Sequence, residues 1–415
     1  MSGARSGHPG ELLAAVRRVL GPDGASDPVD TAARVAWSVI VEPGDAVAGE
    51  LMASLGPERA LGSVLLAADG EFVELLDGCV EAGVPGSEDA DAFGAVLHSA
   101  IDRWRPRLAR SDVGDVVASA EAVGGRLLVP GGAGWPTALD DLGPHAPLVL
   151  WARTATEHVV DSTPVLAVVG SRANTVAGAE AAAEITSTAA DAGCTIVSGG
   201  AYGIDAVAHR VAIAAGTPTV AVLAGGIDQL YPAGNVQLLR NVARQGALLA
   251  ESAPGTRPTR WRFLARNRLI AALADATVVV EAGARSGALN TAHHAGQLGR
   301  AVFAVPGAFA SSASVGCHRL VAQGRAELVV HPGDPVAAMR PLAAAGTSAV
   351  PDEPIASVER DPEVVRVIDA LGRRALPETE IARRSGLSVA EVVDALALAQ
   401  LQGLVVHGSG GWGRS

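Results

Sequence analysis

The feature that most constrains the fold is a regular alternation of short apolar runs and helical segments between residues 165 and 305. The first run, Val165–Val169, ends at Gly170 and is followed by a helical pattern at about 176–192. Continuous apolar strands that alternate with helices are typical of a parallel sheet covered on both faces. The chain is therefore expected to have an α/β fold, an extended Rossmann-like and mostly parallel sheet with helices on both faces. Strands are predicted at Arg126–Val129, Leu148–Trp151, Val165–Val169, Thr195–Val197, Thr219–Leu223, Ala247–Ala250, Thr277–Glu281 and Ala301–Val305.

The segments on either side of this core have different patterns, which indicates a chain of several domains. Before residue 120, apolar residues recur at helical spacing. Beyond residue 360, three helical segments are followed by Leu404–His407 and a glycine-rich turn, the layout of a winged helix. We therefore expect a helical N-terminal domain at 1–120, a Rossmann-like domain at 121–333, a linker at 334–360 and a winged-helix-like domain at 361–415.

The composition excludes several classes of protein. The net charge is −12 and all 32 basic residues are Arg, so any DNA site must be a local positive feature on an acidic body. Cys79, Cys194 and Cys317 lack the spacing of a zinc site or a disulfide framework. The N-terminus lacks a signal-peptide pattern, and no uncharged run reaches the roughly 18–20 residues that span a bilayer. We expect a soluble cytoplasmic protein with no metal site and no membrane partner.

Glycine follows the ends of several predicted strands. The carboxyl ends of parallel strands meet along one edge of a sheet, where ligands bind at the point at which the strand order reverses. Glycine lets a phosphate approach main-chain N–H groups closely, and the following helix N-termini favour anions. One such glycine is explained equally well by a tight turn, but the set favours an anion-binding rim, with an arginine as the charged partner of a phosphate. The predicted rim consists of Gly170, Ser171, Arg172, Ser198, Gly199, Gly200, Gly225, Gly226 and Gly307.

Nucleotide-binding fingerprints are missing from this pattern. No GxGxxG sequence follows the first strand, and a GxxxxGK[ST] loop is impossible in a chain without Lys. We therefore expect neither a standard dinucleotide site nor a P-loop triphosphate site, and no cofactor.

A second candidate feature is an arginine cluster at 256–269 with interleaved aromatic residues. Trp261 and Phe263 stand among the arginines, although aromatic residues make up only 3% of the chain. Guanidinium groups for phosphates and aromatic rings for bases are what a single-strand site requires. Phe263 alone could equally be a core residue, but the cluster favours a functional role. Its arginines are Arg257, Arg260, Arg262, Arg266 and Arg268.

Several segments resemble the DprA/Smf family over about residues 165–330. The motifs are long, ordered and numerous, which makes a chance match implausible. The resemblance is carried by Gly170-Ser171-Arg172, Ser198–Asp205 with Ala208-His209, Leu223–Asp228 with Tyr231-Pro232 and Asn235, Phe263–Arg268, Val280-Glu281-Ala282 with Ser286-Gly287 and Thr291-Ala292, and Val305-Pro306-Gly307.

This resemblance implies a homodimeric protein that binds single-stranded DNA without base specificity. It also implies protection of incoming strands and loading of RecA onto them in natural transformation. The family's strand-binding positions fall on Arg172, Arg260 and Phe263; Leu264 replaces the family's usual Pro, and Arg260 a Lys-type residue, which preserves the charge. The residues expected to contact nucleic acid are Gly170, Ser171, Arg172, Ser198, Gly199, Gly200, Gly225, Gly226, Arg257, Arg260, Phe263, Arg266, Asn267, Arg268, Ser286 and Asn290.

Two other functions remain open as alternatives. The sheet and its glycines also resemble LOG-like nucleotide phosphoribohydrolases, but the PGGxGTxxE motif of those enzymes is not matched at 281–290, and we expect no enzyme. A helix-turn-helix regulator that senses a nucleotide is the second alternative. The helix expected at Val389–Gln402 carries Glu391 and Asp394 and no basic residue, which disfavours reading of the major groove. The acid–base candidates for an enzyme are Asp205, His209, Asp228, Glu251 and Glu281.

Overall fold

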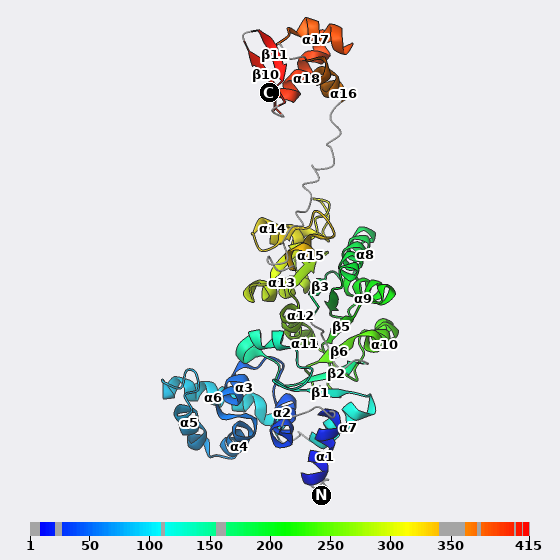
Figure 1. Cartoon of the computed structure of the whole chain (residues 1–415). Coiled ribbons are helices and arrows are strands. Elements are labelled where there is room, and N and C mark those ends of the chain that lie inside the picture. The colour runs from blue at the N-terminus through cyan, green and yellow to red at the C-terminus, as the bar shows by residue number, and fades with distance from the viewer. Residues whose placement is uncertain are drawn as a thin grey trace. The chain divides into compact units, whose positions relative to one another are not determined.

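The chain forms two compact units, Met1–Arg340 and Pro341–Ser415 (Figure 1). Its computed structural model describes residues 9–20, 27–108, 113–154, 163–339, 362–371, 375–401, 404–408 and 410–414. Each unit has a hydrophobic core of its own. Throughout the described ranges, no helix is long and apolar enough to cross a membrane.

The first unit is built on a nine-stranded sheet with the order β1-β2-β6-β5-β4-β3-β7-β8-β9. Neighbouring strands from β6 to β9 are parallel, whereas β2 is antiparallel to both β1 and β6. The expected α/β fold with a mostly parallel sheet is therefore confirmed. The strands are β1 (Arg126–Leu128), β2 (Leu150–Thr154), β3 (Val165–Val169), β4 (Thr195–Ser198), β5 (Thr219–Leu223), β6 (Ala247–Ala250), β7 (Ala276–Val279), β8 (Ala301–Ala304) and β9 (Glu327–Leu328).

The strand order reverses beside β3. In the register of the sheet, Leu166 lies opposite Ile196 of β4 on one side and Ala276 of β7 on the other. The chain proceeds from β3 outward through β4, β5 and β6, and then returns to place β7 on the opposite side of β3. The carboxyl ends of β3 and β7 thus flank the switch point at which open α/β sheets bind ligands.

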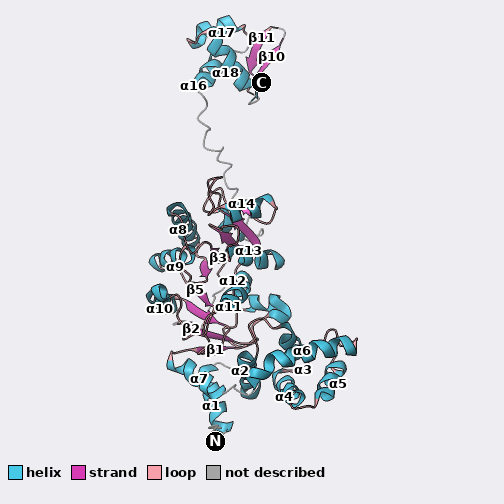
Figure 2. Cartoon of the chain, turned by 180° about the vertical axis from the view of Figure 1, so that it is seen from behind, coloured by secondary structure: helices cyan, strands magenta, loops and turns pink. Residues whose placement is uncertain are grey.

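Helices cover both faces of this sheet (Figure 2). Along β3, Leu166 and Val168 pack into a core shared with α8 and α9, whereas Val165, Ala167 and Val169 pack into a core shared with α12 and α13. Because both faces are buried, every residue of the strand is apolar, which explains the unbroken apolar runs of the sequence. The helices are α8 (Val176–Asp191), α9 (Ile204–Ala215), η2 (Ala233–Asn235), α10 (Val236–Gln245), α11 (Arg260–Ala265), α12 (Asn267–Leu273), α13 (Ala288–Gln297), α14 (Val315–Ala322) and α15 (Asp334–Met339).

The N-terminal part of the unit is helical, as the sequence predicts. Trp37 and Trp104 form an edge-to-face pair at 5.2 Å in a separate core. Val16 and Val117, from the first and last of these helices, pack instead with residues of β1 and β2, so the helical part is continuous with the sheet. Its elements are α1 (Pro9–Leu20), α2 (Pro28–Ile40), α3 (Ala46–Leu55), α4 (Pro57–Ala68), α5 (Phe72–Glu81), α6 (Ala90–Leu108) and α7 (Val113–Ala122), followed by η1 (Thr137–His145) between β1 and β2.

The second unit has the layout of a winged helix. Gly386, at a φ of 74°, ends α17 in the left-handed conformation and makes the turn toward α18. The expected linker begins later than residue 334, because Asp334–Met339 form α15; residues 340–361 lie outside the described ranges. The elements of this unit are α16 (Pro362–Ala370), α17 (Glu378–Ser385), α18 (Val389–Leu401), β10 (Val405–Gly408) and β11 (Gly411–Arg414).

Candidate nucleic-acid interface

A groove of about 910 Å³ lies at the switch point of the sheet. Most of its lining residues come from three segments: Val169–Ala173 at the end of β3, residues of Pro258–Asn267 around α11, and residues of Gly283–Thr291 after β7. The other lining residues are Ala201, Asp205, Tyr231 and Ile270. The predicted position at the carboxyl ends of the strands therefore coincides with a real cleft.

Phe263 is the point at which the lining residues of this groove meet. The Arg172 guanidinium lies over its ring, 4.6 Å from the centroid, and the Arg266 guanidinium is 5.6 Å from the same centroid. Tyr231 approaches the ring edge-to-face at 5.7 Å. Phe263 is only half-buried, so its ring belongs to the groove wall rather than to the core. The sequence left open whether Phe263 is a core residue, and its partial exposure in the groove wall shows that its ring is accessible.

Exposed positive charge surrounds this ring. Arg172, Arg260 and Arg285 are all exposed and line the groove. Asp205 is the acidic residue among the lining residues, and its side chain is buried beneath Arg266 rather than displayed to solvent. The groove is therefore a local cationic site on an acidic protein, which is the arrangement that the net charge demands.

Arg266 forms the floor of the groove. It is 6% exposed, and it donates hydrogen bonds from Nη1 to the carbonyl oxygens of Gly199, at 2.7 Å, and Val222. Burial lowers its pKa to about 10, an effect that the nearby Asp205 carboxylate opposes. Burial raises the pKa of Asp205, and Arg266 is the largest of the influences that oppose that rise. Arg266 stays charged at neutral pH and contributes positive potential from below.

The segment after β7 is tied to this floor by amide side chains. Asn267 donates from Nδ2 to the carbonyl of Gly287 and to Oδ1 of Asn290, both at 3.2 Å. Ser286 caps the turn by accepting a hydrogen bond from the Ala288 N–H at 3.3 Å. These contacts hold the wall that carries Arg285.

Comparison with known proteins matches both units. The family model for DNA recombination-mediator protein A matches residues 126–340, and the model for the DprA winged helix domain matches residues 351–411. The chain belongs to the DprA family. The family expected from the sequence motifs is therefore confirmed.

Named relatives agree with this family. A putative DNA processing protein DprA of Mycobacterium tuberculosis is 46% identical over 303 residues, covering 70% of this chain and 77% of the relative. Protein Smf of Escherichia coli is 36% identical over 256 residues, covering 60% of this chain and 67% of the relative. The solved structure of DprA from Streptococcus pneumoniae superposes with a TM-score of 0.56 at 28% identity, covering 74% of this chain and 96% of that one.

Most glycines of the predicted rim have a packing role in this DprA-family chain. A side chain on Gly199 would lie 2.2 Å from the Arg266 guanidinium, and one on Gly200 would lie 2.7 Å from Leu239. Gly225 and Gly226 lie beneath the 253–258 loop, where a side chain would meet backbone oxygens at 2.7 Å and 2.6 Å. The rim of four glycine turns is thus corrected: Gly170, with Ser171 and Arg172, lines the groove, and the glycines of the other three turns, Gly199, Gly200, Gly225, Gly226 and Gly307, do not.

Three other predicted contact residues lie outside the groove lining. Ser198 is fully buried and donates to the Val168 carbonyl at 2.7 Å. Arg268 is 6% exposed and makes two hydrogen bonds to the Glu251 carboxylate, at 2.8 and 2.7 Å. Arg257 is exposed but does not line the cleft.

The acid–base candidates for an enzyme are engaged in structural contacts. Glu281 is 5% exposed and accepts from the N–H of Thr175, at 3.0 Å, and from its hydroxyl. His209 is fully buried and bonded through Nδ1 to the Thr219 hydroxyl at 2.8 Å, and burial lowers its pKa to about 3. Within the described residues, no group of three or more His, Cys, Asp or Glu residues could hold a metal ion.

Tyr231 and Arg285 also line the groove but were not among the contact residues predicted from the sequence. Tyr231 lies in the loop between β5 and α10, and Arg285 in the loop after β7. Arg285 could have been found, because it follows a predicted strand at the same edge of the sheet as Arg172. Tyr231 could not, since its approach to Phe263 depends on how two distant loops pack.

Proposed function

We propose that this DprA-family protein binds single-stranded DNA in the groove between β3, α11 and β7. The observation that carries the proposal is the exposed guanidinium of Arg172 over the accessible ring of Phe263. A strand needs a cation for its phosphate and an aromatic ring for its base, and both are present at one place in this groove. Arg260 and Arg285 extend the positive charge along the groove.

Binding is proposed to be independent of base sequence. Every base has a face that can stack on an aromatic ring, so the contact with Phe263 does not select among bases. The amide of Asn267, which could read a base edge, is already bonded to Gly287 and Asn290. A duplex hides its base faces, so the site favours a single strand over a duplex.

The cellular role follows from the family resemblance. We propose that the protein is a cytoplasmic homodimer that protects incoming DNA strands and helps to load RecA onto them during natural transformation. We also propose that it is not an enzyme, because His209 and Glu281 are buried and hydrogen-bonded away from the groove. The α/β part at 121–333 is proposed as the DNA-binding domain, with the helical N-terminal domain at 1–120 packed against its sheet and the winged helix at 361–415 as a separate domain.

The test is equilibrium binding of labelled dT oligomers and of a matched duplex by fluorescence anisotropy. Arg172→Ala and Arg260→Ala should each weaken dT binding, and the double variant should abolish it at moderate salt. In a plot of log binding constant against log salt concentration, the slope should be about −0.7 for each phosphate that the protein neutralises. Each single variant should make this slope shallower by about 0.7, because it neutralises one phosphate fewer.

The matched control is Arg240→Ala. Arg240 is an exposed arginine in a different cleft, beside Arg153 and Arg244, and should leave dT binding unchanged. Wild-type affinity in the Arg172→Ala, Arg260→Ala double variant would refute the groove. Release of a base from a nucleoside monophosphate would instead establish the phosphoribohydrolase alternative.

A further inference from the structure

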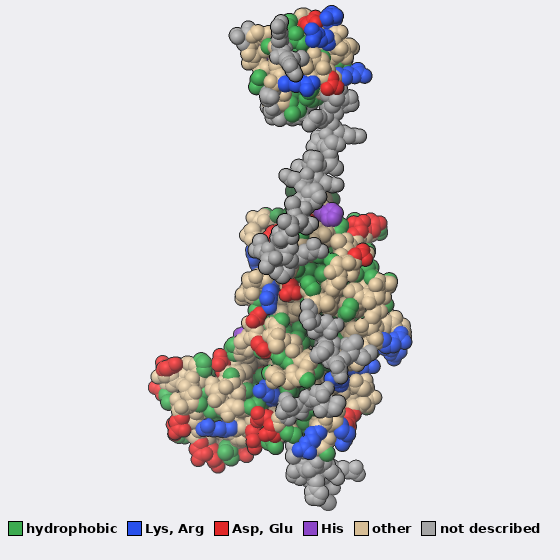
Figure 3. All heavy atoms as spheres, in the orientation of Figure 1, with side chains coloured by type: hydrophobic (Ala, Val, Ile, Leu, Met, Phe, Trp, Pro, Cys, Tyr) green, Lys and Arg blue, Asp and Glu red, His purple; other side chains and the backbone are tan. Residues whose placement is uncertain are grey.

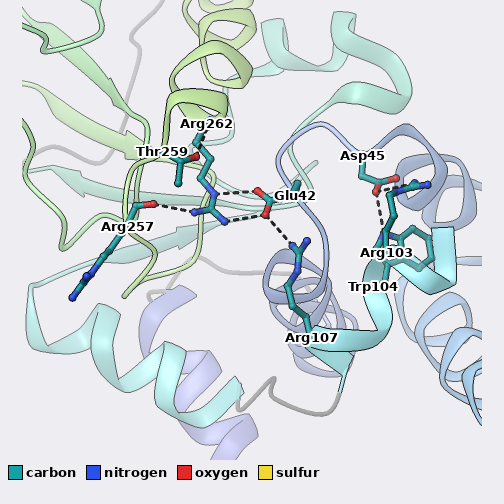
Figure 4. A network of polar contacts seen from close by, with 8 residues as sticks. All are labelled: Glu42, Asp45, Arg103, Trp104, Arg107, Arg257, Thr259 and Arg262. Atoms are coloured by element: carbon teal, nitrogen blue, oxygen red, sulfur yellow. Dashed lines mark hydrogen bonds and ion pairs between the residues drawn. The ribbon is translucent and has the colours of Figure 1, made fainter. Parts of the chain in front are cut away.

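The loop between α2 and α3 joins the helical N-terminal part to α11, the helix that carries Arg260 and Arg262 (Figure 4). The Glu42 carboxylate accepts two hydrogen bonds from Arg262 of α11, one from Nε at 3.0 Å and one from Nη2 at 2.9 Å. Arg107, at the end of α6, contributes a second cation, with Nη1 3.2 Å from Glu42 Oε1. The two-point geometry fixes the plane of the Arg262 guanidinium.

Arg262 differs from the other arginines of its cluster. Its side chain is 20% exposed, and Nη1 also donates to the Arg257 carbonyl at 2.9 Å. It does not line the groove, whereas Arg260 and Phe263 of the same helix do. Residues three apart lie on one face of a helix, so Arg260 and Phe263 point together while Arg262 points elsewhere. A contact that holds Arg262 therefore fixes the rotation of α11 about its own axis, and with it the direction in which Arg260 and Phe263 point.

Helix α11 needs such a contact. It is only six residues long, and none of its residues is buried. Isolated helices shorter than about 12 residues are marginal in water, and helices in proteins gain most of their stability from packing. Besides its Thr259 cap, whose hydroxyl is 3.3 Å from the Arg262 N–H, α11 is held to the helical N-terminal part by the bidentate pair with Glu42.

The same loop also holds the next helix. The Gly44 N–H donates to Glu251 Oε1 at 3.2 Å, and Glu251 is the buried partner of Arg268 in α12. The Gly44 carbonyl lies 2.9 Å from Nδ1 of His145, whose own carbonyl accepts from Arg268 at 3.0 Å. Gly44 has a φ of 79°, and a side chain there would lie 3.0 Å from Nε of Arg268. The loop between α2 and α3 thus holds both α11, through Glu42, and α12, through Gly44.

We propose that Glu42 is a positioning residue for DNA binding: it holds α11, through Arg262, in the orientation in which Arg260 and Phe263 face the strand. The proposal rests on the proposed function of the groove. It assigns the helical N-terminal part a role in setting DNA affinity, because any partner that displaced the loop at 41–45 would release α11.

The sign of the effect separates positioning from simple electrostatics. Glu42 is a carboxylate near a site for a polyanion. If it acted only through its charge, its removal would strengthen DNA binding, because like charges repel. If it positions α11, its removal weakens binding. Glu42→Ala should therefore bind dT oligomers about threefold or more weakly, within the range found for substitutions that act through an intermediate contact.

The experiment compares wild type with Glu42→Ala, Arg262→Ala, the double variant and Glu50→Ala in the full-length protein. Glu50, in α3 of the same helical part, forms no ion pair with α11 among the described residues, so its replacement is the matched loss of one negative charge. The double variant should bind as weakly as Arg262→Ala and no more weakly, because Glu42 acts through Arg262. Amide hydrogen exchange at 260–266 should be faster in Glu42→Ala than in wild type without DNA present.

Each outcome bears on the proposal. Unchanged or tighter dT binding by Glu42→Ala, with unchanged exchange at 260–266, would overturn it, as would an equal loss of affinity in Glu50→Ala. An additional loss in the double variant would show that Glu42 does not act through Arg262. Arg172→Ala is run alongside: if it binds dT as wild type does, the proposed groove fails; if it is weakened and Glu42→Ala is not, the positioning role alone fails.

Discussion

At the scale of single residues, the groove depends on one ring and the cations around it. Phe263 receives Arg172 on its face, Tyr231 on its edge and Arg266 from below, at 4.6, 5.7 and 5.6 Å. Cation–π contacts of this kind strengthen when water is excluded, as a stacked base would do. The ring is therefore both a stacking surface and the residue that orients the phosphate-binding arginine.

Replacement of Phe263 by Leu should separate stacking from charge. The variant keeps an apolar side chain of similar size but loses the ring, so dT affinity should fall by about 1–3 kcal/mol, the measured range for one aromatic platform. Because no phosphate contact is removed, the slope of affinity against salt should stay at its wild-type value, unlike that of Arg172→Ala. Anisotropy titrations at several salt concentrations measure both quantities.

Trp261 provides the control for this experiment. It lies two residues before Phe263 in α11 and is 60% exposed, yet it does not line the groove. Trp261→Leu should leave dT affinity within about twofold of wild type, as expected for a site without shared contacts. A loss as large as that of Phe263→Leu would mean that the strand follows a different path.

The buried imidazole of His209 should make the stability of the fold depend on pH. Burial lowers its pKa to about 3 from the usual 6.5, with a smaller lowering by Arg266. The unfolded chain therefore takes up this proton first, so the stability contributed by the neutral imidazole is complete above pH 6.5 and is lost as the pH falls toward 3. Between pH 7 and pH 5, the free energy of unfolding of wild type should fall by about 2 kcal/mol more than that of His209→Gln. Urea denaturation at the two pH values tests this, and parallel losses in the two proteins would contradict it.

At the scale of elements, the sequence predicted the strands of the sheet well and the roles of its glycines poorly. The strands could be found because burial on both faces leaves β3 wholly apolar and β5 apolar from Val220 to Leu223. The glycine turns looked alike in sequence, but Gly170 lines the groove and also makes room for Ile204, while Gly199 makes room for the guanidinium of Arg266. Which side chain each glycine accommodates, and whether it also lines the groove, depends on contacts between segments far apart in the chain, and a single sequence does not record them.

At the scale of elements, α8 begins shortly after the turn at Gly170-Ser171-Arg172, and its first turn is held by Thr175. Thr175 caps the helix by accepting from the Gly178 N–H at 3.0 Å, and its hydroxyl donates to the buried Glu281. Thr175→Val should destabilise the unit by about 1–3 kcal/mol, because it removes the cap and leaves part of a buried carboxylate without a donor. The control is Thr188→Val, which loses only a hydroxyl bonded to the Glu184 carbonyl within the same helix. Equal midpoints of urea unfolding for the two variants would contradict this role of Thr175.

At the scale of the whole molecule, the charge distribution explains how an acidic chain can present a DNA site. The net charge is −12, and on the face shown in Figure 3 acidic side chains gather over the N-terminal helices α4–α6. Long-range attraction for DNA is therefore weak, and affinity must come from short-range contacts in the groove. The sequence could predict this contrast from composition and the arginine cluster, but it could not show that Arg262 and Arg268 are neutralised by Glu42 and Glu251.

Because the chain forms two compact units, we expect a chain that ends at Arg340 to keep the whole DNA site. Every residue that lines the groove lies in the first unit, and so does the loop around Glu42 that holds α11. The helix of the winged unit that would enter a DNA groove, α18, has no basic residue and exposes Glu391 and Asp394. The truncated chain should therefore bind dT oligomers within about twofold of the full-length protein, since distant and independent parts contribute additively. The isolated unit 341–415, which has its own core, should not bind them. A tenfold loss on truncation would mean that the winged unit completes the DNA site, and the single-groove account would then have to be abandoned.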